Sequence, residues 1–262
     1  MRKNTSKDPL YSLMTSVTKT APSNGMVRRG LQAIRAHLGM DVAYISEFVG
    51  NQTVFRDVDA PGLENRIKVG DSYSHDDIYC RHILEGRLPQ LIADTSTEPA
   101  AMAMPITQAV PIGKHMSVPI RLPDGSVYGM FCCLGVEADR SLNERDMQMM
   151  KVFADLAAFE IGRDVEASKR AEKERGRITT IIEKQQIAIV YQPIWELKSP
   201  RPIGLESLCR FSAVPRRSPD KWFVEATQAG MGTSLEVAAI RQGLSVLGSL
   251  PLSECVAAHN FE

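Results

Sequence analysis

The sequence YQPIWELKSPRPIGLESLCRF, residues 191–211, decides how the second half of the chain is interpreted. It includes parts of two short apolar runs, Ile187–Ile194 and Ile203–Leu208, which a proline-rich polar turn separates. Short runs rich in β-branched residues that are interrupted by proline and serine are typical of strands joined by a loop. We therefore expect a strand–loop–strand unit here.

The second run carries two charged side chains, Glu206 and Arg210, four residues apart. On a strand, residues two and four apart share one face, so Glu206, Leu208 and Arg210 point the same way. Carboxylate oxygens suit Mg²⁺ or Ca²⁺, and the forked donors of arginine suit phosphate. Spacing alone favours a salt-bridged pair on a sheet face over a site that holds an anionic ligand through a divalent cation.

Two motifs in this stretch resemble the opening of the EAL domain, the family of cyclic-di-GMP phosphodiesterases. That family opens with a Tyr-Gln-Pro-Ile strand, matched by residues 191–194, and continues with Glu-x-Leu-x-Arg, matched by residues 206–210. The Glu-Ala-Leu of the family is Glu206-Ser207-Leu208 here, a small-for-small change that leaves the carboxylate in place. The resemblance implies an α/β, TIM-like barrel, of which residues 187–262 are the N-terminal portion.

The resemblance also implies site residues and a substrate, cyclic-di-GMP. Glu206 resembles the first ligand of the metal, Mg²⁺ or Mn²⁺, and Arg210 resembles a contact to a phosphate of the substrate. Gln192 and Leu208 complete the substrate-binding set. Asn260 lies where the family has an asparagine metal ligand at a strand end, although the histidine before it departs from the usual aliphatic residue or serine.

Most of the catalytic apparatus of that family has no counterpart in this sequence, which ends at Glu262. The later Asp-Asp pair, the catalytic lysine and a further glutamate of the family are all missing. Two-metal hydrolysis needs several carboxylates to hold both ions and activate water. We therefore expect an incomplete barrel that does not hydrolyse cyclic-di-GMP by itself, and whether the chain is an enzyme stays open. The alternative is a non-catalytic sensor or dimerisation module.

Composition limits the class of protein. The 262 residues include 31 Lys and Arg and 31 Asp and Glu, a formal net charge of +0, which argues against a nucleic-acid-coating surface. The sequence shows no apolar run of membrane-spanning length. It also shows no evident signal peptide. The five cysteines form an odd set without paired spacing, which indicates free thiols in a reducing compartment. We expect a cytoplasmic protein without nucleic-acid or membrane partners.

The first half of the chain alternates between strand and helix patterns. These patterns predict helices at Met26–Leu38 and Ile78–Leu84, strands at Asp41–Phe48, Thr53–Val58 and Leu88–Asp94, an irregular stretch at Glu98–Pro111, and a hairpin of His115–Leu122 with Val127–Val136. Such an order indicates an α+β fold with helices covering a sheet. Residues 76–80, 86–95, 118–120 and 128–133 are similar to GAF domains, which implies a GAF-like domain at residues 24–165.

GAF domains are sensors of small ligands and many act as dimers, but the fold does not name the ligand. A covalent bilin on Cys80 or a haem on His82 is a possible cofactor, although a buried structural thiol is the commoner state of such a cysteine. Cys132 and Cys133 are neighbours on an expected strand and should face opposite sides of it. The ligand of this domain therefore stays unknown.

A long charged helix is expected at residues 141–186, overlapping the end of the GAF-like domain. Ser141 and Glu144 have the spacing of a capping box. A partly heptad apolar stripe indicates a relay helix that supports a homodimer, while a solvated linker is nearly as well supported. Residues 1–23 form an N-terminal extension, with a weakly amphipathic helix expected at residues 8–20.

Overall fold

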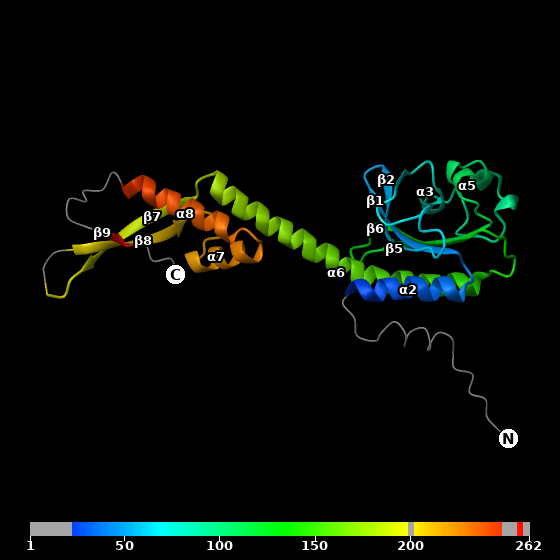
Figure 1. Cartoon of the computed structure of the whole chain (residues 1–262), viewed down its shortest axis with the longest axis horizontal. Helices are drawn as coiled ribbons and strands as arrows, with labels where there is room; N and C mark the ends of the chain where they lie inside the picture. Colours follow the sequence, from blue (N-terminus) through cyan, green and yellow to red (C-terminus); the bar gives the residue numbers. More distant parts are fainter. Residues whose placement is uncertain (1–22, 199–201, 248–255, 259–262) are drawn as a thin grey trace, which may run out of the picture. The chain divides into compact units, whose positions relative to one another are not determined.

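The computed structural model describes residues 23–198, 202–247 and 256–258, and it divides into one compact unit up to Asp164 and a second from Val165 onward (Figure 1). The helix expected at residues 8–20 and the proposed ligand Asn260 lie outside the described residues. Each unit has its own sheet and its own apolar cluster.

The first unit is built on a six-stranded antiparallel sheet with the order β3-β2-β1-β6-β5-β4. Its strands are β1 (Val42–Val49), β2 (Gln52–Asp59), β3 (Ser72–Ser74), β4 (Leu91–Ile92), β5 (Lys114–Arg121) and β6 (Val127–Gly135). The expected first two strands and the hairpin are confirmed, whereas the strand expected at residues 88–94 is reduced to the two residues of β4.

One face of this sheet packs on two helices, α2 (Ser23–His37) and the first half of α6 (Glu144–Glu183), as Figure 1 shows. Alternate strand residues point to opposite faces. Ile45, Val118 and Cys133 therefore join a cluster with Leu31 of α2 and Phe153 of α6. This face forms a continuous apolar core.

The opposite face is covered by short helical segments. These are α3 (Tyr79–Leu84), a 3-10 turn (Thr95–Thr97), α4 (Pro99–Met102) and α5 (Pro105–Ala109). The expectation of an irregular stretch at residues 98–111 was wrong, because α4 and α5 occur there. Each begins with a proline, whose fixed φ and missing N–H suit the first helical position.

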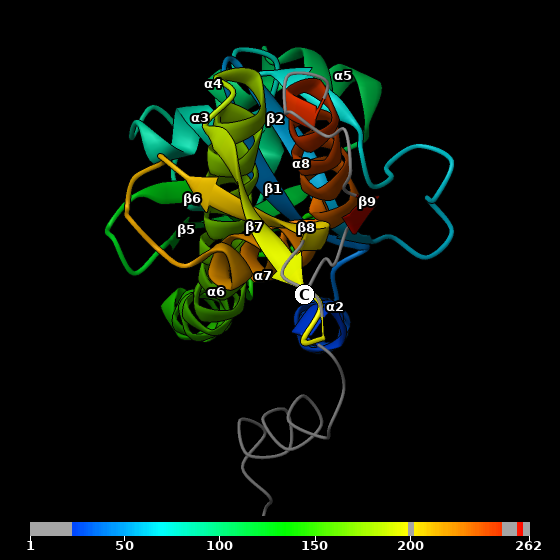
Figure 2. The ribbon, with the colours of Figure 1, turned by 90° about the vertical axis from the view of Figure 1, so that its left-hand side faces the viewer.

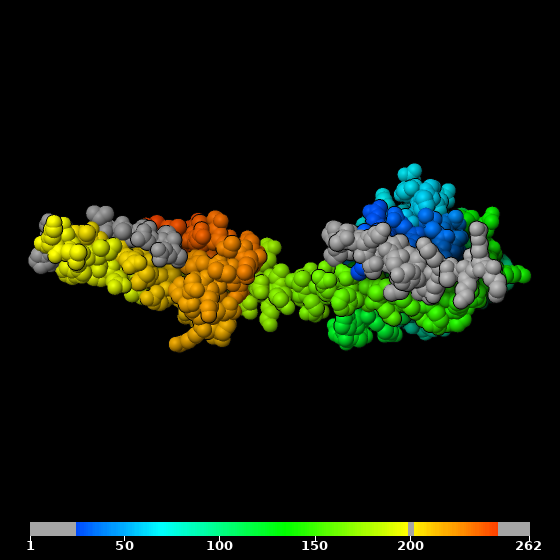
Figure 3. Space-filling view, turned by 90° about the horizontal axis from the view of Figure 1, so that it is seen from below, coloured from blue at the N-terminus to red at the C-terminus, as the bar shows by residue number. Residues whose placement is uncertain are grey.

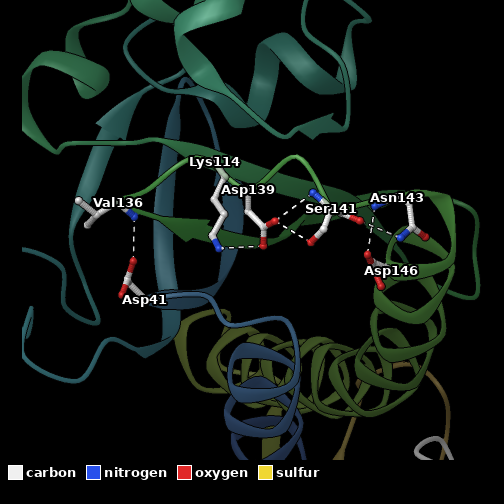
Figure 4. Close-up of polar contacts among 7 residues, drawn as sticks. All are labelled: Asp41, Lys114, Val136, Asp139, Ser141, Asn143 and Asp146. Atoms are coloured by element: carbon white, nitrogen blue, oxygen red, sulfur yellow. Dashed lines mark hydrogen bonds and ion pairs between the residues drawn. The ribbon is translucent and has the colours of Figure 1, made fainter.

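Helix α6 is one continuous helix of 40 residues. The expected capping box at Ser141 and Glu144 was wrong, because the Oδ1 of Asn143 accepts from the backbone N–H of Arg145. The backbone N–H of Asn143 donates to Asp146, as Figure 4 shows. This reciprocal pair is a capping box shifted by two residues. The hydroxyl of Ser141 bonds to Asp139 instead.

The middle of α6 is mostly exposed. Between residues 163 and 176 every side chain is exposed or intermediate, and Figure 3 shows this stretch in space-filling form. The partly heptad apolar stripe expected on this helix is therefore buried only at the two ends of the helix. Met150 and Phe153 are buried in the first unit and Ile178 and Ile181 in the second, but Ala171 is exposed.

The second unit has a three-stranded sheet, β7-β8-β9, and two helices. Its elements are β7 (Ile187–Trp195), β8 (Pro202–Phe211), α7 (Pro219–Gln228), α8 (Gly232–Leu247) and β9 (Val256–Ala258). The expected strand–loop–strand unit is confirmed, since β7 and β8 pair antiparallel. Strands β8 and β9 pair parallel across α7 and α8, which is the β-α-β crossover that also builds parallel barrels.

Helices α7 and α8 lie on one face of this sheet, as Figure 2 shows. Trp222, Leu235 and Ala239 of the helices form an apolar cluster with Ile187 of β7. The hydroxyl of Tyr191 also points to this side and donates to the carbonyl of Gly243, at 2.6 Å.

Candidate ligand pocket and candidate nucleotide-binding face

A small pocket lies in the first unit between the sheet and the short helical segments. Its cavity volume is about 20 Å³, which is room for about one water molecule. It is lined mainly by aromatic and aliphatic side chains: Tyr44, Phe55, Ile67, Tyr73, Ile78, Tyr79, Ile106, Val110, Ile112, His115 and Leu134. Concave apolar sites with a few polar groups are typical of small-molecule pockets. In this conformation the space is nearly filled.

His115 is the one imidazole in that lining. It sits near the start of β5, opposite Ile92 of β4 and Leu134 of β6, and its side chain is only 1% exposed. Its ring meets Tyr79 edge-on with centroids 4.9 Å apart. Neither Nδ1 nor Nε2 has a hydrogen-bond partner among the described residues.

Burial fixes the charge state of this imidazole. Desolvation lowers the pKa of His115 to about 3, so the ring is neutral near pH 7. A neutral imidazole has one N–H donor and one acceptor nitrogen. Leaving a buried polar group unpaired costs about 1–3 kcal/mol. A ligand that pairs with either nitrogen would remove that cost.

The hydroxyl of Tyr79, in contrast, is already hydrogen-bonded within the protein. It lies 2.5 Å from the Oγ1 of Thr107, which in turn donates to the carbonyl of Ala101 at 2.5 Å. These contacts tie α3 to α4 and α5 over the pocket. Burial raises the pKa of Tyr79, which keeps it neutral. His115, in contrast, is a buried polar group of the wall whose two nitrogens stay available to a ligand.

The suggested chromophore residues do not meet in this pocket. Cys80 is fully buried and its Sγ contacts Cys132 rather than the pocket. His82 lies near the surface, where its Nε2 is 3.3 Å from the carbonyl of Asp76. Cys132 and Cys133 face opposite sides of β6, as expected from their spacing.

A chain of polar contacts leads from β5 to the start of α6 (Figure 4). Lys114, adjacent to His115 but on the opposite sheet face, places its Nζ 3.4 Å from Asp139. Asp139 accepts from both the backbone N–H and the hydroxyl of Ser141, at 3.0 and 2.6 Å. The carbonyl of Ser141 then accepts from the side chain of Asn143, which caps α6.

Gly135 allows this arrangement, because a Cβ there would lie 2.4 Å from the Cε of Lys114. The lysine stem therefore runs across the glycine of the neighbouring strand, with which Lys114 is paired in register. The buried stem and its carboxylate partner join the pocket strand to the helix start.

In the second unit, the structure brings together the site residues expected in β7 and β8. Gln192 is paired in register with Glu206, and Leu208 and Arg210 follow at alternate positions of β8. The intervening residues pack against the helices, so these four lie on the opposite face. Gln192 and Arg210 are exposed, whereas Glu206 and Leu208 are partly exposed.

The described residues around Glu206 do not form a divalent-metal site by themselves. Glu206 could provide one oxygen ligand for Mg²⁺ or Mn²⁺. Among the described residues, however, no three or more His, Cys, Asp or Glu side chains gather where they could hold an ion. Glu206 and its neighbours thus do not make a complete metal site, and no hydrolytic step follows from them alone.

His115 and the Cys80–Cys132 contact were not predicted from the sequence. The strand carrying His115 was recognised, and its alternation places the ring on the face opposite Met116. Nothing in the local sequence indicates that both ring nitrogens lack partners. The two cysteines are 52 residues apart, without a motif that relates them.

An antiparallel sheet with helices on one face and short helical segments over a small apolar pocket on the other is the architecture of GAF-type sensor domains. A family model described as GAF domain matches residues 20–161, more than half of the chain, and the chain belongs to that family. The EAL resemblance rests on its motifs alone. No curated protein matches the chain.

Solved structures with this fold are distant in sequence. A GAF domain from a phosphoenolpyruvate-protein phosphotransferase of Coxiella burnetii is 15% identical, with a TM-score of 0.51, and the match covers 62% of this chain and 95% of that one. A GAF domain of the same kind of protein from Acinetobacter is 11% identical, with a TM-score of 0.49 and coverages of 60% and 92%. The phycoerythrobilin-bound GAF domain of a cyanobacterial phytochrome is 16% identical, with a TM-score of 0.47 and coverages of 61% and 96%.

Proposed function

We propose that this chain is a signalling sensor whose GAF domain binds a small, uncharged, largely apolar ligand through His115. The observation that carries the proposal is a fully buried, neutral imidazole with two unpartnered nitrogens in the wall of an apolar pocket. An anionic ligand is disfavoured, because no cationic side chain lines that pocket. A planar molecule with one donor or acceptor fits this chemistry.

Entry of such a ligand requires the covering segments to move, since the space is nearly filled. The bonds of Tyr79 with the α4–α5 region hold the cover. We propose that displacement of this cover and of β5 reaches α6 through Lys114 and Asp139. The coupling element is then the capped start of α6 rather than its exposed middle.

The ligand-binding part of the proposal can be tested with phenol and indole as probes. We expect both to raise the melting temperature of the chain, and His115→Leu, which keeps an apolar pocket, to abolish most of that increase. His82→Leu is the matched control, because His82 lies outside the pocket lining. Equal stabilisation of the parent chain and His115→Leu would reject His115 as the contact.

We further propose that residues 187–262 are the start of an EAL-type domain that the sensor regulates in the cytoplasm. In that arrangement Gln192, Glu206, Leu208 and Arg210 contribute to a site for cyclic-di-GMP and Mg²⁺ or Mn²⁺. Their common position on the sheet face away from α7 and α8 supports the proposal, because helices cover the outside of a β/α barrel and the site lies inside it. The antiparallel β7 is a departure from an all-parallel barrel.

Incubation with cyclic-di-GMP and Mn²⁺, followed by chromatography for the linear dinucleotide, tests the catalytic side. We expect no turnover, because the described residues present a single carboxylate on that face. Titration of the nucleotide should still show binding that Arg210→Ala weakens and Arg241→Ala on α8 does not. Unchanged binding in Arg210→Ala would remove Arg210 from the proposed site.

The second candidate function is a dimerisation module. Val152, Leu156 and Phe159 on α6 are 41%, 38% and 60% exposed and lie on one helical face. A second copy that packs on this face would bury it. Light scattering should then report a homodimer that Phe159→Glu converts to a monomer. Ser168→Glu, the same change of charge at an exposed position on another face of α6, should leave it intact.

A further inference from the structure

Two buried thiols touch in the first unit. Cys80, the second residue of α3, places its Sγ 3.7 Å from the Sγ of Cys132 in β6. Both residues are 0% exposed. They join the short helix that covers the pocket to the central part of the sheet.

Three hydroxyl groups surround this sulfur pair. The hydroxyl of Tyr44 lies 3.6 Å from the Sγ of Cys80, and the Oγ of Ser46 lies 3.9 Å from it. The Oγ of Ser117 lies 3.1 Å from the Sγ of Cys132. Ser46 also bonds to the backbone of Met130, so the two thiols lie in a hydrogen-bonded polar environment within the apolar core.

The two thiols differ chemically. The hydrogen bond from Cys132 is the largest influence that lowers the pKa of Cys80, and the hydroxyls of Tyr44 and Ser46 act in the same direction. Burial raises the pKa of Cys132. Cys80 is therefore the better thiolate of the pair. Cys133, which faces aliphatic side chains on the other side of β6, provides a buried thiol without this environment.

The sulfur pair lies one side chain away from the pocket. Tyr44, whose hydroxyl contacts Cys80, also lines the pocket. The space within that pocket admits a molecule the size of water. Hydrogen peroxide is only slightly larger.

We propose that Cys80 and Cys132 are a redox-active pair that hydrogen peroxide converts to a disulfide. The Cys80 thiolate attacks one peroxide oxygen, the O–O bond breaks, and the departing hydroxide takes a proton, leaving a sulfenic acid on Cys80. Cys132 then attacks that sulfur, the S–O bond breaks and water leaves. In sum, two thiols and one peroxide give one disulfide and two waters.

The disulfide would change the pocket. A disulfide has its sulfurs about 2.05 Å apart, so the two atoms must approach by about 1.7 Å. Because β6 is central in the sheet, the short helix α3 is the element that moves. Tyr79 precedes Cys80 and contacts His115, so its ring moves with α3. Oxidation would thereby alter the pocket, although the pair itself does not depend on the proposed ligand.

The test is a disulfide map of the whole chain after exposure to hydrogen peroxide in its folded state. Remaining thiols are alkylated after unfolding, and proteolytic peptides are identified by mass spectrometry. We expect a linked peptide pair that contains Cys80 and Cys132, about 2 Da lighter than the two reduced peptides together, and its loss on treatment with dithiothreitol.

Variants separate this pair from other thiols. Cys133→Ser should keep the linked peptides, whereas Cys132→Ser should remove them and leave Cys80 as a sulfenic acid that dimedone traps. Complete alkylation of Cys80 and Cys132 in the peroxide-treated parent chain would overturn the proposal. Linkage of either cysteine to any other cysteine would also overturn it. Both of these results come from the parent chain, so they do not depend on whether a variant folds.

Discussion

The sheets of the two units differ in how their faces are covered. In the six-stranded sheet both faces are packed, and the polar groups left on the pocket face are buried with few partners, His115 above all. In the three-stranded sheet one face packs on α7 and α8, while the other carries Gln192, Glu206 and Arg210 in exposed or partly exposed positions. A polar side chain thus has a different meaning on each sheet: in the first it indicates a ligand contact, and in the second it indicates a surface open to binding or to further structure.

The largest effect should come from the covered side of the second unit. Glu225 of α7 is 7% exposed and pairs with Arg177 of α6, at 2.6 Å, and with Arg217. Glu225→Ala leaves two arginines without their partner, and we expect a loss of about 3–5 kcal/mol in the free energy of unfolding. Urea denaturation measures it, with the exposed Glu236→Ala as control. A loss below about 1 kcal/mol would show that this network does not hold the helices.

Two leucines in the same unit test the difference between its sheet faces directly. Leu235→Ala removes a fully buried side chain and should cost about 2–5 kcal/mol. Leu208→Ala, on the uncovered face, should cost under about 1 kcal/mol. Both values come from the same denaturation experiment. Equal losses would mean that the face carrying Leu208 is packed as well.

The charge of His115 should make the first unit sensitive to acid. Its pKa is about 3 in the folded chain and about 6.5 when unfolded, so only the unfolded state gains this proton between those values. The stabilisation by neutral His115 is complete above pH 6.5 and falls as the pH drops toward 3. We expect about 2 kcal/mol less stability at pH 5 than at pH 7 from this group.

His115→Leu isolates that contribution, because carboxylates titrate in both chains alike. The difference in unfolding free energy between the two chains should change by about 2 kcal/mol from pH 7 to pH 5. A constant difference would show that the imidazole is protonated, or accessible to water, in the folded state.

The smallest effect concerns the start of α6. Asn143→Ala removes the side chain that accepts from the N–H of Arg145, and we expect a loss of about 1 kcal/mol. Ser141→Ala, at the position that the sequence pattern favoured, should cost less, because its hydroxyl bonds to Asp139 outside the helix. The reverse order of the two losses would restore the original capping assignment.

Local sequence patterns predicted most helices and strands. They failed for the helix cap and for His115, where contacts between residues distant in the sequence determine the structure. Alternation predicted β1, β2 and the β5–β6 hairpin, and it placed Glu206, Leu208 and Arg210 on one face. Ser141 and Glu144 fit the capping-box pattern, but the contact of Ser141 with Asp139 leaves Asn143 as the cap of α6. His115 became a candidate only when α3 and β4 were seen around it.

The most direct test of the account is the ring nitrogen spectrum of His115 in ¹⁵N-histidine-labelled protein, recorded while phenol or indole is added. Direct bonding predicts that the His115 nitrogen signals, assigned with His115→Leu, shift in proportion to ligand occupancy, while those of His82 stay in place. Saturable binding with unchanged His115 signals would contradict the central claim that this imidazole is the polar contact of the sensor pocket.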